Sequence, residues 1–250
     1  LHKLQSYYMT SRLLSILITS IILAGVSVKT KAQNEYPTIN PTAIYITDEG
    51  EEENEAISAS APLTGKFLAN PENIGAYSPY YEWRFTLEGE NEPYLTRYEE
   101  NTEYTFTTAG SHSIVLYATF VNGNDTIAYT QEYWDEVGPL RATISESKLE
   151  MPNAFSPNGD GINDIYKAKE GYQSIVKFEA YIFNRWGQKI FEWNDPAQGW
   201  DGTHKGKDVK DGVYFVLVKA KGADGRTFTI KRDVNLLRGY TESSTIGGGE

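Results

Sequence analysis

Short, largely apolar runs separated by polar turn residues recur throughout this chain after its first 32 residues. The clearest runs are residues 113–121, 126–133, 178–183, 188–193, 213–219 and 227–234. They are rich in β-branched and aromatic residues and are bounded by Gly, Asn, Asp or Pro, as strands between turns are. Helical periodicity is hard to find in the same part of the chain. The pattern therefore predicts an all-β fold built from antiparallel β-sandwich domains.

One of these pairs of runs predicts a β-hairpin. Residues 113–121 and 126–133 are separated by Asn122-Gly123-Asn124-Asp125, and such residues readily adopt the positive φ that a tight turn requires. The acidic run of residues 48–55, in contrast, has the composition of a solvated loop.

The first residues have the order of a secretory signal peptide. Arg12 precedes an apolar run at residues 13–28, and the small-residue exit Thr30-Lys31-Ala32 follows. The apolar run has about 16 residues, fewer than the roughly 20 that a membrane-spanning helix needs. We therefore expect residues 1–32 to be a signal peptide, with Met9 as the start and cleavage after Ala32. The protein is expected to be exported to the cell surface, the outer membrane or the medium.

The distribution of charge divides the rest of the chain. Residues 33–150 contain 21 acidic and 5 basic side chains, a net charge of -16, whereas residues 151–250 contain 13 acidic and 14 basic, a net charge of +1. This asymmetry favours two domains, and the acidic first part would repel the phosphates of a nucleic acid. We expect no nucleic-acid partner.

The composition offers little for catalysis. The chain has no cysteine, which excludes disulfides and thiol nucleophiles, so stability after export must come from packing or a metal. The histidines of the expected mature chain, His112 and His204, are expected to face solvent. Glu82, Glu88 and Asp201 leave a carboxylate hydrolase as an alternative, but we expect a protein that is not an enzyme.

The first part of the chain resembles the PKD-type immunoglobulin-like domain. The resemblance lies in Tyr80-Tyr-Glu-Trp-Arg-Phe85 and in the stretch from Tyr104 to Leu116. It implies that Trp83 is a core residue, that Gly110 makes a turn, and that Ile114 and Leu116 pack over the tryptophan. It also implies a spacer or a binding passenger over residues 33–150. The alternative is an adhesin that binds a glycan or protein through Tyr80, Tyr81, Tyr94 and Tyr98, with a purely structural C-terminal domain.

The second part resembles the gliding-motility-associated C-terminal domain of Bacteroidetes, a type B sorting domain of the type IX secretion system. The resemblance rests on six blocks in order: residues 152–164, 182–187, 190–191, 199–202, 212–214 and 236–238. It implies a second immunoglobulin-like sandwich at residues 151–240 before a flexible tail at 241–250. The implied function is that of a sorting or anchoring module, with a secretion translocon or outer-membrane anchoring machinery as partner. The implied sorting-motif residues are Asn184, Arg185, Trp186, Gly187, Gly199, Trp200, Asp201, Gly202, Leu236 and Arg238.

Two of these blocks also have a physical interpretation of their own. Residues 184–187 and 199–202 are aromatic-bearing turns, in which glycine relieves the cost of a left-handed backbone and tryptophan can cover the end of a sheet. The alternative is that Trp186 and Trp200 form a platform on which a sugar stacks.

The run of residues 152–166 has the spacing of a calcium loop. Oxygen ligands are offered by Ser156, Asn158, Asp160 and Asp164 and by the carbonyl of Ile162, and Gly161 stands where such a loop turns sharply. The first position is serine rather than aspartate, and the twelfth is Lys167 rather than glutamate, so only a weak site is expected. The alternative is a tight turn whose side chains cap their own backbone amides.

Overall fold

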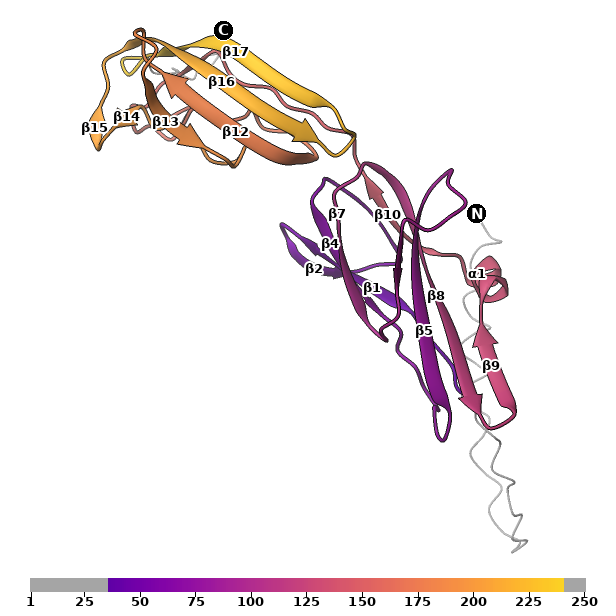
Figure 1. Cartoon of the computed structure of the whole chain (residues 1–250). Coiled ribbons are helices and arrows are strands. Elements are labelled where there is room, and N and C mark those ends of the chain that lie inside the picture. Colours follow the sequence, from indigo (N-terminus) through magenta and orange to yellow (C-terminus); the bar gives the residue numbers. More distant parts are fainter. Residues whose placement is uncertain (1–35, 241–250) are drawn as a thin grey trace, which may run out of the picture. The chain divides into compact units, whose positions relative to one another are not determined.

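The computed structural model describes residues 36–240 (Figure 1). The predicted signal peptide and the predicted tail, residues 1–32 and 241–250, lie outside the described residues. Strands predominate in the described range, beside one short helix, so the all-β prediction is confirmed. No helix within residues 36–240 is long and apolar enough to cross a membrane.

Residues 42–144 form two sheets. The first has the strand order β2-β1-β4-β7, and the second has the order β3-β10-β8-β5-β6, with β9 also paired to β8. All of these pairings are antiparallel except that of β3 with β10. The strands are β1 Thr42–Thr47, β2 Gly50–Glu53, β3 Ala56–Ala59, β4 Leu63–Leu68, β5 Ser78–Leu87, β6 Leu95–Arg97, β7 Thr102–Phe106, β8 Gly110–Asn122, β9 Asp125–Tyr129 and β10 Leu140–Ile144.

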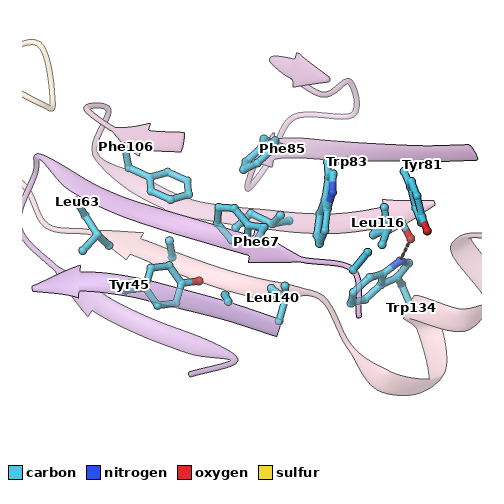
Figure 2. Packing of buried hydrophobic residues seen from close by; sticks show 14 of the residues in the cluster. Tyr45, Leu63, Phe67, Tyr81, Trp83, Phe85, Phe106, Leu116, Trp134 and Leu140 are labelled. Carbon is cyan, nitrogen blue, oxygen red and sulfur yellow. Dashed lines mark hydrogen bonds between the residues drawn. The ribbon is translucent and has the colours of Figure 1, made fainter. Parts of the chain in front are cut away.

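The core between these sheets is built by strict alternation along β5 and β8. Trp83 and Phe85 on β5 are fully buried, as are Ile114 and Leu116 on β8. Phe67 of the other sheet packs edge-on against Phe85, with ring centroids 5.2 Å apart, and Figure 2 shows Phe67 beside Trp83 and Phe85. Aromatic pairs prefer this geometry. The predicted core positions of Trp83, Ile114 and Leu116 are therefore confirmed.

The predicted hairpin is confirmed in its turn but not in its length. β8 and β9 pair antiparallel through Asn122 and Asp125, and Gly123 has φ +61°. The prediction of a strand through residue 133 was wrong, because β9 ends at Tyr129 and helix α1, Gln131–Val137, follows. Trp134 explains the change: it is buried, and its Nε1 donates to the carbonyl oxygen of Leu116 at 2.8 Å. That tertiary contact outweighs the strand propensity of the local sequence.

The acidic run was also predicted wrongly as a loop. Its residues Gly50–Glu53 form β2, the edge strand of the first sheet, and all four are exposed. A row of glutamates on an edge strand discourages pairing with another chain. The run is solvated, as expected, but it is ordered by pairing with β1.

Residues 154–236 form a five-stranded sheet of order β11-β17-β16-β12-β13. Every strand predicted in this region is confirmed. Its buried face carries Ala180, Ile182, Val216, Val218 and Val234, and the opposite layer is mostly irregular chain containing the buried Tyr166 and Trp200. The strands are β11 Ala154–Phe155, β12 Ile175–Phe183, β13 Lys189–Trp193, β16 Gly212–Gly222 and β17 Thr227–Leu236, beside the two-residue pair β14 Thr203–His204 and β15 Lys207–Asp208.

Residues 147–153 cover the outer edge of β17. Arg226 Nη1 donates to the carbonyl oxygen of Ser147 at 3.1 Å, and Arg232 Nη1 donates to that of Met151 at 2.8 Å. Asn235 N then donates to the carbonyl oxygen of Asn153 at 2.9 Å, where the parallel pairing of β11 with β17 begins. Arginine side chains therefore supply hydrogen bonds to the carbonyl oxygens of Ser147 and Met151, which form no backbone hydrogen bonds with β17.

Candidate functional site

The turn between β12 and β13 is a rigid support for two exposed side chains. Asn184 Oδ1 accepts hydrogen bonds from the backbone N–H groups of Trp186 and Gln188, both at 3.0 Å. Gly187 N donates to the carbonyl oxygen of Asn184 at 2.9 Å, and Gly187 has φ +77°, as the predicted turn requires. Asn184 and Gly187 thus shape the turn.

The other two residues of this turn point outward. Trp186 is 75% exposed, so it does not cover the end of the sheet as predicted. The guanidinium carbon of Arg185 lies 4.4 Å from the centroid of the Trp186 ring, which is a cation–π contact. The pair forms an exposed aromatic and cationic tip.

A cavity of about 350 Å³ lies beside this tip. Its walls come from the turn itself, from β13 and β14, and from the chain that leads into β16. The pairing of β12 with β16, in which Phe183 lies opposite Phe215, brings that chain beside the turn. The lining residues are Asn184, Arg185, Trp186, Gln188, Ile190, His204, Val209, Lys210, Asp211, Gly212, Val213 and Tyr214.

The second aromatic turn has a structural task. Trp200 is fully buried, its ring centroid lies 5.0 Å from that of Tyr214, and its Nε1 donates to the carbonyl oxygen of Thr203 at 2.7 Å. Asp201 Oδ1 accepts from Thr203 N at 2.9 Å and caps this turn. A sugar platform made of Trp186 and Trp200 is therefore wrong, because Trp200 is inaccessible.

The predicted Leu236 and Arg238 close the same end of the domain. Leu236 is fully buried on β17. The Arg238 guanidinium donates to the carbonyl oxygens of Val209 at 2.7 Å and Gly202 at 2.8 Å, and it pairs with Asp208 at 3.2 Å. Arg238 N also donates to Asp211 Oδ2 at 3.0 Å. Arg238 therefore fixes the loop that forms one wall of the cavity.

The comparisons with known proteins address this region. Residues 149–231 match the family model described as the CHU_C type IX secretion signal domain. The match supports the predicted sorting domain, and it implies export and an interaction with secretion machinery. It does not extend to the preceding region, whose PKD-type resemblance stays a prediction.

Two further comparisons add little. No curated protein matches the chain. Among solved structures, the crystal structure of dimeric latent PorU from Porphyromonas gingivalis aligns over 86% of this chain and 21% of that chain, at 10% identity and a TM-score of 0.24. The alignment thus spans about a fifth of that protein. A TM-score this low supports no conclusion about shared fold or function.

The candidate calcium loop lies near the start of the family-matched residues, and its oxygens already have hydrogen-bond donors. Asp164 accepts the backbone N–H groups of Asn158, Gly159 and Gly161, at 2.9, 2.8 and 2.8 Å. These bonds lower the pKa of the Asp164 carboxyl. These N–H groups stabilise the ionised carboxylate from within the loop, as side-chain capping of a tight turn does.

The other predicted ligands belong to the same network. Asp160 Oδ1 accepts from Ile162 N, and Asn158 Oδ1 accepts from Asp160 N, at 2.8 and 3.0 Å. Ser156 Oγ donates to the carbonyl oxygen of Ile162 at 3.5 Å. Residues 36–240 hold no group of three His, Cys, Asp or Glu arranged for a metal. The geometry is that of the capped turn, and calcium binding stays a prediction.

Residues singled out in the first region are scattered. Tyr80, Tyr94 and Tyr98 are exposed, but Tyr81 is in the core and was wrongly grouped with them. His112 is also buried rather than solvent-facing, since β8 turns it inward. Glu82 forms an ion pair with Arg84 at 2.8 Å.

Several cavity residues were not predicted from the sequence, among them Val209, Lys210 and Val213. Val209 and Lys210 come from the chain before β16 and Val213 from β16 itself, far from residue 186 in the sequence, and the β12–β16 pairing brings them to the turn. The one signal in the sequence is that residues 182–187 and 212–214 both belong to blocks of the resemblance.

Proposed function

We propose that residues 149–240 are a type IX sorting or anchoring module of an exported, non-enzymatic protein, and that residues 36–144 are its spacer or binding passenger. The observation that carries this proposal is the family match over residues 149–231. The matched residues include a hydrophobic core of their own, with Leu149, Met151, Tyr166, Trp193 and Trp200 among its buried members. A module of this kind can be recognised as a folded unit.

The proposal is tested by truncation in a bacterium that possesses the type IX system. A chain ending at Ser145 keeps β10 and loses the module. We expect the full chain to be digested by protease added to intact cells, and the truncated chain to remain protected in the periplasm. Surface display of the truncated chain at the level of the full chain would contradict the proposal.

A transfer experiment supplies the converse. Residues 146–250 are fused behind a signal peptide and an unrelated periplasmic protein. The fusion is expected to become sensitive to external protease, while the same passenger without the module stays protected. A module that is purely structural would leave both passengers in the periplasm.

A second candidate function rests on Tyr80 and Tyr98, which are 63% and 70% exposed on the first region. Exposed aromatic side chains are common anchors in binding surfaces. Under this adhesin hypothesis, Tyr80→Ala with Tyr98→Ala removes binding on a glycan array or adhesion to cells. The buried Tyr81 is excluded from the test because its loss would damage the core.

A further inference from the structure

Trp186 is exposed in a way that no other tryptophan of the chain is. The remaining four, Trp83, Trp134, Trp193 and Trp200, are at most 8% exposed, whereas Trp186 is 75% exposed. The turn that carries it is shaped by Asn184 and Gly187 and makes no use of the indole ring. A large apolar side chain held in water on a rigid turn points to a partner.

The uncompensated charge around this tryptophan is positive. Within residues 36–240, neither Arg185 nor Lys210 forms an ion pair. The one carboxylate of the cavity wall, Asp211, pairs with Arg238 at 3.5 Å and also accepts its backbone N–H. The cavity therefore offers two cations that no carboxylate of residues 36–240 pairs with, beside an aromatic ring.

Apolar surface continues from this cavity along the outer face of β16. Val213 and Phe215 are 49% and 44% exposed. A second, shallow cavity of about 350 Å³ follows, with Phe183, Phe215 and Leu217 in its walls together with the charged Lys231, Arg232 and Asp233. Residues 213 to 217 extend about 13 Å along the strand at roughly 3.3 Å per residue. A ligand that fills both cavities must be extended.

We propose that this surface, consisting of Arg185, Trp186, Lys210, Val213 and Phe215, binds an extended peptide segment of a partner protein. The segment carries acidic side chains next to apolar ones. The acidic side chains pair with Arg185 and Lys210, and the apolar ones pack against Trp186. The inference rests on the proposed sorting function, since it assigns the face by which the module is recognised.

A glycan fits the same surface less well. Sugar sites commonly use amide and carboxylate groups for the hydroxyls, but Asn184 Nδ2 donates to Gln188 Oε1 at 3.1 Å and Asp211 is held by Arg238. Arg185 also covers one face of the Trp186 ring. Beside the Gln188 amide nitrogen, the His204 ring and the carboxylate of Asp233, the groups left free are cations and hydrocarbon, which match an acidic, apolar peptide.

The exposure of Trp186 provides the assay. Because the other tryptophans are buried, acrylamide quenching of the purified full chain should report mainly on Trp186. The probe is the peptide acetyl-Glu-Phe-Glu-Val-amide, which contains no tryptophan, and its neutral counterpart has Gln in place of Glu. We expect the acidic peptide to protect the fluorescence, and the neutral one to bind at least about tenfold more weakly.

Variants then locate the site by calorimetry. Trp186→Ala and Lys210→Ala should each lower the affinity for the acidic peptide at least about tenfold, which is the loss typical of a central binding residue. Lys219→Ala is the matched control, because Lys219 is an exposed lysine elsewhere on β16, and it should bind as the parent does. Unchanged melting temperatures show that the variants remain folded.

Two outcomes would overturn the inference. One is that neither peptide protects Trp186 at millimolar concentration. The other is that chitotriose or a galacturonate trimer protects Trp186 while the acidic peptide does not, which would make the cavity a glycan site.

Secretion in type IX-competent cells separates this inference from the proposed function. Trp186→Ala with Lys210→Ala should reduce surface display of the full chain at least about tenfold, and Lys219→Ala should not. If the chain ending at Ser145 is retained but the double variant is displayed normally, the sorting function stands and the docking surface is wrong. If the truncated chain is displayed, the sorting function itself fails, whatever the peptide assay shows.

Discussion

Asp164 organises the loop at residues 156–164 by accepting three backbone N–H groups. We expect Asp164→Ala to lower the melting temperature of the full chain, because three donors lose their acceptor at once. The decrease should be the same in calcium and in EDTA, since the hydrogen bonds involve no metal. Differential scanning calorimetry in both buffers checks this.

The calcium hypothesis makes a different prediction for the same experiment. If the loop binds calcium, millimolar calcium raises the melting temperature of the parent chain, and Asp164→Ala abolishes the increase. Ser156→Ala is the milder companion variant, since its hydroxyl makes only the 3.5 Å contact with the Ile162 carbonyl oxygen.

His112 should make the first region sensitive to mild acid. Burial lowers its pKa below the ordinary 6.5. The neutral ring fits both of its neighbours, as Nε2 donates to the Thr108 carbonyl oxygen at 2.8 Å and Nδ1 accepts from the Tyr94 hydroxyl at 2.9 Å. Glu90 and Glu92 line the cavity beside it.

Between the lowered pKa and about 6.5 the unfolded chain binds more protons than the folded one, so stability rises with pH. We therefore expect the free energy of unfolding to fall as the pH decreases below about 6.5, with a smaller change in His112→Gln. Denaturant melts at pH 5 and 7 measure the free energy of unfolding of both proteins. An equal loss in His112→Gln would contradict the assignment of this pH dependence to His112.

Asp224 does not contribute to the change between pH 5 and 7. Its pKa is lowered to about 2, mainly by its hydrogen bond with Ser147, so its contribution to stability is lost only below the ordinary pKa of 3.8.

The strand-like bridge between Tyr166 and Trp200 requires a glycine at position 199. Tyr166 N donates to the Trp200 carbonyl oxygen at 2.8 Å, and Trp200 N donates back to Tyr166 at 3.0 Å. A Cβ on Gly199 would press against the Tyr166 carbonyl oxygen and lie 2.8 Å from both Ile165 Cγ2 and Lys167 Cβ. We expect Gly199→Ala to destabilise the second region by about 1–3 kcal/mol or more, the usual cost of overpacking.

Gly239→Ala is the matched control, because nothing lies within 4 Å of the added carbon and the backbone there needs no positive φ. It should melt as the parent does in thermal and denaturant unfolding. If Gly199→Ala behaves like Gly239→Ala, the close approach at residue 199 is not a constraint on this layer.

Elements marked by their own composition could be predicted, whereas elements that depend on distant contacts could not. β12, β16 and β17 lie in runs rich in β-branched and aromatic residues between turn residues, and they were found. Helix α1 was missed because its short polar sequence has one buried residue, Trp134. The hydrogen-bond acceptor of Trp134 is the Leu116 carbonyl oxygen, which lies on β8. The cavity beside Trp186 was missed for the same reason, since its walls meet only through strand pairing. Trp186 and Trp200 looked alike in sequence, and only burial distinguished the exposed tip from the core residue.

At the scale of the whole molecule, residues 145–153 connect the sheets of the first region to the family-matched region and are also part of its fold. Leu149 and Met151 are buried in the second core, and Arg232 binds the Met151 carbonyl oxygen at 2.8 Å. The family match begins at residue 149, before the first strand of the five-stranded sheet at Ala154. We therefore infer that the smallest stable module begins before Leu149.

Two fragments test this boundary. A fragment of residues 145–240 should unfold cooperatively, whereas one of residues 154–240 should be unfolded or aggregate. The shorter fragment loses two buried side chains, each worth about 2–5 kcal/mol when cut back to alanine, against a usual total stability of about 5–15 kcal/mol. It also uncovers the edge of β17, and open strand edges pair with other chains. Circular dichroism melts and size-exclusion chromatography distinguish the fragments. Leu149→Ala with Met151→Ala in the longer fragment should reproduce much of the loss, and an equally stable residue 154–240 fragment would show that residues 147–153 are only a linker.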